Sequence, residues 1–439
     1  MSKTVIRLIT LVLAVAMVAS MAVGCDGPQG ASGNKNSGEL SGLQADVNPA
    51  DYEGTTVTFV TWKDPATQED GPVVEAFQEE YGIKVAIQMT DQMEYVSQIS
   101  ASIASDKQGD IFFENDTFPA SLSVMQPLDA MKLDLESDFW NKAVIEASKF
   151  EGKPYLVDAV NNVWTEVDLC VYNKNLLESN NIRTPKEYYE AGKWTFENFK
   201  KVAEEVTALG KGYVGATSHG GILMAAGGNT AFVFDGQKFS SNINNDLIEV
   251  ATFLAQMNQD GTLKFDATSF QDGKVGMAIT NAYALKKAGY FSKINPDHMG
   301  FTYLPKWTED SEQISTGIYR GWGLIKGAKN PVAAGIFLRE YLDAGNYDTA
   351  DTFHSEEASE FFYELTGNYA EQEIVYYHES AMHVAYAGDR YDMMWMKTKP
   401  TQMRTYFDGQ ANVISRMVDD ANATLDTERK WLKDNGFIQ

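Results

Sequence analysis

The stretch VTFVTWKDPATQEDGPVVEAFQEEYGIKVAIQM, residues 57–89, decides the fold of this chain. It opens with a short β-rich run at 57–60, which is typical of a strand buried on both faces. Apolar residues then recur at helical spacing through 73–81, and Gly82 is suited to end that helix. Apolar and other residues alternate over 83–89, which is the period of a second strand.

The same order of elements continues outward from this stretch. A second helical stripe at 96–103 and a third strand at 110–113 complete a βαβαβ unit, which predicts a parallel sheet with helices packed on it. Later signals mark a helix cap, two strands and a helix start: Thr195, 275–279, 300–304 and Asn330–Pro331. The last hundred residues are predicted to be mostly helical. Two α/β lobes fit the length and pattern better than one very large sheet.

Composition excludes several classes of partner and site. The formal net charge is -25, which argues against nucleic acid and against binding of anionic lipid through protein charge. The only cysteines are Cys25 and Cys170, so no intramolecular disulfide framework is expected. Cys170 lies in an apolar run and is predicted to be a buried structural thiol. The five histidines are scattered and lack zinc-ligand spacing, so we expect no metal and no cofactor.

The N-terminus has the layout of a secretory signal. Lys3 and Arg7 precede an apolar run at 8–18, and small residues then lead to Cys25. This arrangement resembles the bacterial lipoprotein signal, which implies that residues 1–24 are removed and that Cys25 carries lipid. An ordinary cleaved signal is the alternative, because Ala22 stands where the lipoprotein motif usually has Leu. Residues 25–50, rich in small and polar groups after the cysteine, are expected to form a flexible tether.

An ordered series of local signatures extends over roughly residues 55–345. It runs through nine segments: 59–62, 76–85, 109–113, 126–129, 152–155, 171–177, 193–199, 272–279 and 326–338. In this order the segments resemble the extracellular solute-binding proteins of ABC importers, the family that includes maltodextrin-binding protein.

The resemblance implies a two-lobed, periplasmic-binding-protein-like α/β fold of type II, with a ligand cleft between lobes joined by a hinge. By analogy, lobe I comprises 51–160 and 314–345, and lobe II comprises 161–313 and 346–439. It further implies a monomer without catalytic residues that binds a carbohydrate, most simply an oligosaccharide, and delivers it to the transmembrane subunits of an ABC permease. With the lipid anchor, the protein is expected at the extracellular face of the cytoplasmic membrane.

A carbohydrate site needs flat aromatic platforms for the sugar faces and a few polar groups for the hydroxyls. The chain supplies 8 Trp and 21 Tyr. Trp62 follows the first strand, at a carboxyl end where ligands of open α/β sheets bind. Glu114, Asn115 and Asp116 follow the third strand at the equivalent edge, where they are expected to accept hydrogen bonds from hydroxyls.

The resemblance adds further ligand-contact candidates. Asn161, Asn162 and Trp164 fall where the first crossover of the family passes the cleft. Asn281 and Tyr283 occupy the segment where the family usually has Gly-x-Trp. The remaining candidates are on the strand returning to lobe I, where flanking glycines are expected to let backbone approach a ligand, and in the C-terminal region: Arg320, Trp322 and Trp395.

Two other functions stay open on the sequence alone. The same importer role for a non-sugar solute predicts fewer aromatic platforms in the cleft. A secreted glycosidase is compatible with the many acidic residues, although no carboxylate pair is selected by its spacing.

Overall fold

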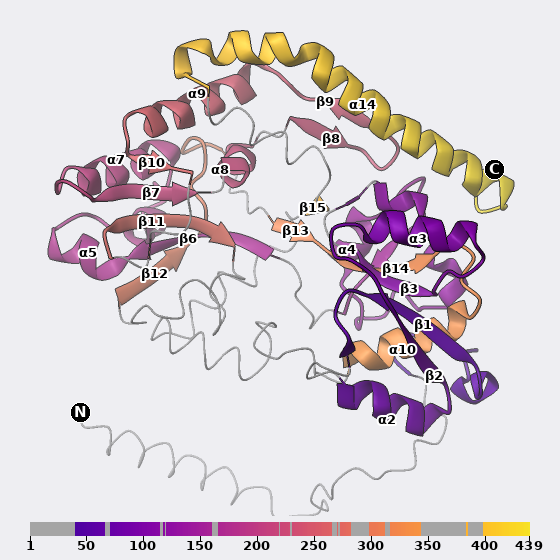
Figure 1. Cartoon of the computed structure of the whole chain (residues 1–439). Helices are drawn as coiled ribbons and strands as arrows, with labels where there is room; N and C mark the ends of the chain where they lie inside the picture. The colour runs from indigo at the N-terminus through magenta and orange to yellow at the C-terminus, as the bar shows by residue number, and fades with distance from the viewer. Residues whose placement is uncertain are drawn as a thin grey trace, which may run out of the picture. The chain divides into compact units, whose positions relative to one another are not determined.

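The structure is a computed structural model, and it describes most of the chain from residue 40 onward (Figure 1). The described residues are 40–65, 71–114, 117–118, 120–159, 166–218, 220–228, 231–265, 270, 273–281, 298–311, 317–343, 383–384 and 398–439. Residues 40–439 form one unit by their contacts. Two mixed sheets organise this unit, and the α/β expectation is confirmed.

The first sheet has the strand order β2-β1-β3-β14-β4, and β5 also pairs with β14. Its strands are β1 (Thr56–Thr61), β2 (Lys84–Met89), β3 (Ile111–Glu114), β4 (Met125–Gln126), β5 (Leu156–Val157) and β14 (Gly321–Ile325). The first three strands are parallel, and β14 runs antiparallel to β3. The βαβαβ prediction for 57–113 is thereby confirmed.

Helices cover both faces of the first sheet. They are α2 (Gly71–Tyr81), α3 (Tyr95–Ala104), α4 (Lys142–Ala147) and α10 (Pro331–Asp343), with 3-10 turns η1 (Pro49–Tyr52), η3 (Ala120–Ser123) and η4 (Leu128–Met131). Along β1, Val57 and Phe59 join the apolar cluster that contains α2 and α10, whereas Val60 joins the cluster that contains α3. This alternation follows from the two-residue period of a strand, and it places the aromatic side chains in two layers.

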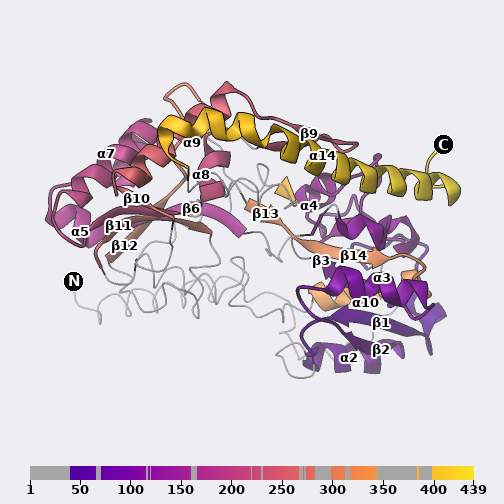
Figure 2. The same cartoon turned by 45° about the horizontal axis from the view of Figure 1, so that its top comes forward.

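The second sheet has the order β10-β7-β11-β6-β13-β15, with β12 also paired to β6. Figure 2 shows β6, β11 and β12 of this sheet side by side. Its strands are β6 (Glu166–Asn173), β7 (Val214–Ser218), β10 (Leu263–Lys264), β11 (Val275–Asn281), β12 (Met299–Thr302), β13 (Gly317–Tyr319) and β15 (His383–Val384). Its helices are α5 (Lys174–Ser179), α6 (Pro185–Glu190), α7 (Phe196–Thr207), α8 (Gly220–Ala226) and α9 (Asn245–Gln259). Thr195 caps α7 by accepting a hydrogen bond from the Asn198 amide, as its sequence predicts.

The described residues bracket the places where the chain crosses between the sheets. The predicted limits at 160/161, 313/314 and 345/346 all fall outside the described residues. The lobe I segment was expected to begin at 314, but β13 at 317–319 still pairs with β6 of the second sheet. The return to the first sheet comes at Arg320, directly before β14, so this expected boundary is a few residues too early.

The segment 40–48 packs on the first lobe. Leu43 is buried and forms a β-bridge with Leu133. The Trp140 indole Nε1 donates to the Gly42 carbonyl at 2.8 Å, and Arg339 Nε donates to the Ser41 carbonyl at 3.0 Å. The tether was expected to span 25–50, but its last residues are part of the folded protein, because Leu43 buries apolar surface that a Gly- and Ser-rich linker lacks. Residues 25–39 lie outside the described residues.

A two-stranded hairpin and the C-terminal helix contact both lobes. The hairpin is β8 (Phe232–Phe234) with β9 (Phe239–Ser241), and the helix is α14 (Met403–Asp434), which follows the short turn η12 (Pro400–Gln402). The helix packs against α9 of the second lobe, against β9, and against η3 of the first lobe. This helix was assigned to lobe II on the sequence alone, and its C-terminal turns in fact contact lobe I.

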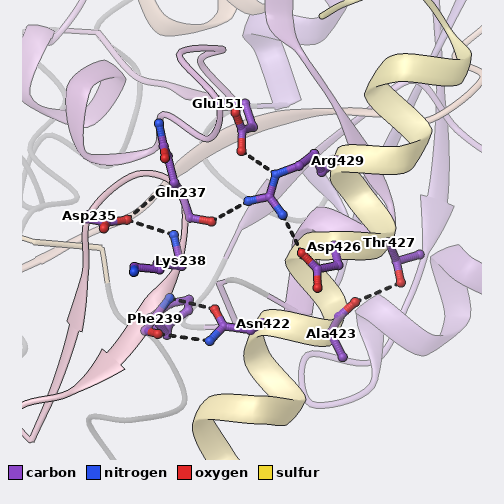
Figure 3. A network of polar contacts seen from close by, with 10 residues as sticks. All are labelled: Glu151, Asp235, Gln237, Lys238, Phe239, Asn422, Ala423, Asp426, Thr427 and Arg429. Atoms are coloured by element: carbon purple, nitrogen blue, oxygen red, sulfur yellow. Dashed lines mark hydrogen bonds and ion pairs between the residues drawn. The ribbon is translucent and has the colours of Figure 1, made fainter. Parts of the chain in front are cut away.

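Arg429 and Asn422 fasten α14 to its surroundings (Figure 3). Arg429 donates through Nε to Glu151 of the first lobe at 2.5 Å and through Nη2 to the Gln237 carbonyl of the hairpin at 2.7 Å. Asn422 accepts from the Phe239 amide at 2.8 Å and donates to the Phe239 carbonyl at 3.0 Å, which satisfies both backbone groups of that residue. The contacts join three segments that are far apart in the sequence.

A buried charged cluster lies one helical position away. Glu428 is 1% exposed, accepts a hydrogen bond from the Tyr155 hydroxyl at 2.7 Å and pairs with Lys326. The Lys326 ammonium also lies 4.7 Å from the centroid of the Trp431 ring. Burial raises the pKa of Glu428 and lowers the pKa of Lys326, while the charge of each partner opposes the shift of the other. Burying the two charges therefore carries a desolvation penalty, and this penalty is compensated only when both Glu428 and Lys326 are present.

We expect Lys326→Met to lower the free energy of unfolding by about 3–5 kcal/mol, because it leaves the Glu428 carboxylate buried without its counter-ion. Chemical denaturation followed by circular dichroism measures this loss. Adding Glu428→Leu and Tyr155→Phe to Lys326→Met removes the carboxylate and the hydroxyl bound to it, and should recover part of the stability, although the Leu122 and Ser123 carbonyls still lose the Lys326 donor. Lys329→Met is the matched control, since Lys329 pairs with Asp106 at an exposed position and should matter little. Equal losses of unfolding free energy in Lys326→Met and Lys329→Met would contradict the role of Lys326 as the counter-ion of buried Glu428.

Candidate functional site

Three of the predicted segments meet at one edge of the first sheet. The parallel strands β1 and β3 end at this edge, where Trp62 directly follows β1 and Glu114 is the last residue of β3. Because β14 is antiparallel, it begins at the same edge, and Gly321 pairs directly with Glu114. Arg320 precedes that pair and is half-buried. The carboxyl edge of parallel strands is where open α/β sheets bind ligands.

Trp62 is a half-buried aromatic side chain supported from within the lobe. Its ring centroid lies 5.8 Å from that of Tyr95 and 6.1 Å from that of Phe113, both in tilted geometry. Tyr95 and Phe113 are buried, whereas Trp62 keeps part of its surface open. An aromatic ring held in this way at a sheet edge offers a platform for an apolar ligand face.

Glu114 does not have the exposure expected of a ligand contact. Its side chain is 0% exposed, and its Oε1 accepts hydrogen bonds from the Thr117 amide at 2.7 Å and the Thr117 hydroxyl at 2.9 Å. Longer hydrogen bonds come from the hydroxyls of Tyr95 at 3.3 Å and Ser121 at 3.4 Å. The carboxylate thus points inward, because Thr117, Tyr95 and Ser121 supply its donors from within the lobe.

Trp322 was expected to be a platform, and the structure places it in the core. It is 2% exposed, and its ring lies 5.2 Å from Phe59 and 5.3 Å from Phe113. The flanking glycines serve strand packing rather than ligand approach. A Cβ at Gly323 would meet the Met125 sulfur at 2.7 Å, and one at Gly321 would meet the Val157 carbonyl at 3.0 Å.

The second sheet brings polar groups together at its own carboxyl edge. Strand β7 ends at Ser218 and the parallel strand β11 ends at Asn281, whose register partner is Asp168 near the start of β6. Ser218, Asp168 and Thr280 are buried polar side chains. Asn281 was predicted, whereas Asp168 and Ser218 were missed. The available signal was a polar residue at the end of each otherwise apolar strand.

The remaining candidates lie outside the described residues. They are Cys25, Asn115, Asp116, Asn161, Asn162, Trp164, Tyr283 and Trp395. The structure does describe Cys170, which is buried in β6, and burial raises the pKa of its thiol well above the usual range. Within the described ranges, no group of three or more His, Cys, Asp or Glu side chains could hold a metal ion. Over those same ranges, no helix is both long and apolar enough to cross a membrane.

Comparisons with known proteins agree with this arrangement. The sequence profile of the family described as bacterial extracellular solute-binding protein matches residues 53–347. No curated protein sequence matches the chain. The GacH receptor of Streptomyces glaucescens, solved unliganded and with acarbose, is similar at a TM-score of 0.56 and 19% identity, over 87% of this chain and 99% of its own.

Two further solved structures show the same fold. The extracellular solute-binding protein of Staphylococcus aureus, in complex with maltose, has a TM-score of 0.57 and 17% identity over 87% of this chain and 99% of its own. The cyclic alpha-maltosyl-1,6-maltose binding protein of Arthrobacter globiformis has a TM-score of 0.61 and 14% identity, over 85% of this chain and 99% of its own.

The chain belongs to the bacterial extracellular solute-binding proteins, since the family profile covers most of its length. It is therefore a solute-binding protein of an ABC transporter, and it binds its solute without transforming it. The family and the expected fold are both confirmed, and the glycosidase alternative is set aside.

The two tryptophans at the first sheet should respond differently to truncation. Trp322→Ala should lower the free energy of unfolding by about 3–5 kcal/mol, because it empties a volume surrounded by buried aromatic rings. Trp62→Ala should cost clearly less, because part of that ring is already in solvent. Thermal and denaturant unfolding of both variants measures the contrast, and a larger loss for Trp62→Ala would contradict the burial described above.

Proposed function

We propose that this protein is the carbohydrate-binding subunit of an ABC importer and that it takes an oligosaccharide. The observation that carries the proposal is the half-buried Trp62 at the carboxyl edge of the first sheet, supported by Tyr95 and Phe113. A pyranose ring has apolar faces that stack on such a platform. The structural neighbours support the choice: the GacH receptor was solved with acarbose, the Staphylococcus aureus protein with maltose, and the Arthrobacter globiformis protein is a cyclic alpha-maltosyl-1,6-maltose binding protein.

In this proposal the two lobes supply different chemistry. The first contributes the aromatic platform, and we propose Arg320, directly before β14 at the same sheet edge, as a further contact for the solute. The second contributes the carboxyl edge at which β7 and β11 end, with Asn281 as the residue proposed to meet solute hydroxyl groups. A solute held by both edges stabilises the closed form through contacts that the open form lacks, and the closed form docks on the permease.

Titration calorimetry against a panel of solutes tests the proposal. The panel contains maltose, maltotetraose, lacto-N-biose and cycloalternan, with a dipeptide and a free amino acid as non-sugar controls. We expect binding of at least one oligosaccharide and of neither control. Binding of a control with no response to any sugar would contradict the carbohydrate assignment and favour the same importer role for another solute.

Trp62→Ala should weaken binding of the best panel sugar by about 1–3 kcal/mol, as expected when a buried aromatic contact is lost. The matched control is Trp307→Ala. Trp307 is also half-buried, but it packs on Phe196 and Phe253 of the helices of the second lobe. Calorimetry on both variants should show a loss only for Trp62. If Trp62→Ala binds the sugar with unchanged affinity, Trp62 is not part of the binding site.

We further propose that Cys25 carries the lipid that holds the protein at the extracellular face of the membrane. The support is the sequence pattern that precedes the cysteine. Cells fed an alkyne-tagged fatty acid should label the wild-type protein, and Cys25→Ala should abolish the label. A labelled Cys25→Ala protein would contradict the proposal.

A further inference from the structure

A buried hydrogen-bonded cluster lies directly beneath the proposed platform. Glu114 at the end of β3 accepts from Thr117 and from Ser121 of η3, and Tyr95 at the start of α3 completes the group. The Tyr95 and Thr117 hydroxyls are also hydrogen-bonded to each other. The cluster joins a strand, the turn after it and a helix, so it fixes how these three segments meet.

The cluster reaches the platform through Tyr95. This side chain is 1% exposed, and its ring lies 5.7 Å from Phe112 on one side and 5.8 Å from Trp62 on the other. The Tyr95 hydroxyl is hydrogen-bonded to Glu114 and Thr117, and these bonds restrict movement of the ring. Because Trp62 rests on that ring and on Phe113, the position of Tyr95 sets where the open face of Trp62 lies.

We propose that Tyr95 and Glu114 are positioning residues, which set the plane of Trp62 instead of touching the solute. This inference rests on the proposed function for its consequence in binding, but its structural part is independent of any ligand. A carboxylate with no exposed surface cannot accept a hydrogen bond from an incoming hydroxyl unless the groups that cover it move. Such a rearrangement is costly, because the Thr117 amide and the surrounding hydroxyls would lose their shared acceptor.

Fluorine NMR of protein labelled with 5-fluorotryptophan tests the structural part without a ligand. Trp62→Phe assigns the Trp62 resonance among those of the eight tryptophans. Tyr95→Phe and Thr117→Val should each shift or broaden that resonance. Tyr155→Phe is the matched control. It also removes a buried tyrosine hydroxyl that donates to a glutamate, Glu428, but that pair does not lie at the sheet edge that carries Trp62. It should lower stability and leave the Trp62 resonance in place.

A double-mutant cycle with maltotetraose as the probe tests the consequence in binding. Tyr95→Phe should weaken binding about two- to tenfold, in the range of one lost hydrogen bond, and should have no effect in the Trp62→Ala background. Glu114→Ala should behave in the same way, and Glu114→Gln should restore part of the affinity because it keeps an acceptor oxygen. If Glu114→Ala does not fold, the Tyr95→Phe and Thr117→Val variants carry the test.

The outcomes separate the two proposals. An unmoved Trp62 resonance in folded Tyr95→Phe and Thr117→Val overturns the positioning role. A Glu114→Ala effect that persists in the Trp62→Ala background also overturns it, because Glu114 would then act on the solute itself. Absence of maltotetraose binding by the wild-type protein counts against that sugar as the solute, and the NMR result then decides the positioning role alone.

Discussion

The antiparallel pairing of β14 with β3 is the constraint on which the rest of the structure depends. Residues 321–324 return to pair with 111–114 after about 200 intervening residues, which include most strands of the second sheet. The entropy cost of closing a loop grows only slowly with its length. The pairing of β14 with β3 can therefore offset this cost once each sheet has its own hydrophobic core. This pairing places Trp322 between Phe59 and Phe113, and it brings Arg320 to the sheet edge beside Glu114.

That pairing also gives two tryptophans of the same sheet opposite roles. Both belong to one series of aromatic contacts, in which Trp62 packs on Phe113 and Phe113 packs on Trp322. Trp322 is surrounded because Phe59 and Tyr341 close over its other sides. Trp62 lies one residue past the end of β1, where the series reaches the edge. The buried rings of Phe113 and Trp322 support the ring of Trp62, so the position of Trp62 depends on the packing of the core.

Periodicity and caps predicted the local elements well, because the signals for β1, α2, β2 and α7 are contained within a few residues. The edge on which Trp62 and Glu114 lie could be predicted too, since it follows from strand direction. The orientation of side chains could not be predicted in the same way. Glu114 turns inward because Tyr95 and Thr117 supply donors, and Trp322 is covered by Tyr341 of α10. The expected tether was too long for a similar reason, because the partners of 40–48 are Leu133, Trp140 and Arg339.

The packed segment 40–48 determines how the proposed lipid anchor would act on the protein. Since Ser41, Gly42 and Leu43 are held by residues of the first lobe, the chain leaves the folded protein from that lobe. Residues 26–39 are all that remains between Leu40 and a lipidated Cys25, and fourteen residues reach at most about 50 Å when fully extended. An anchor of this kind would therefore restrain the lobe that carries Trp62, and closure would appear as movement of the second lobe relative to the membrane.

Because α14 is fastened to Glu151 and Lys326 of the first lobe, its C-terminal turns would stay with the anchored part while the rest of the helix follows α9. Contacts with both lobes along its length make α14 a segment that any closure of the lobes would have to accommodate.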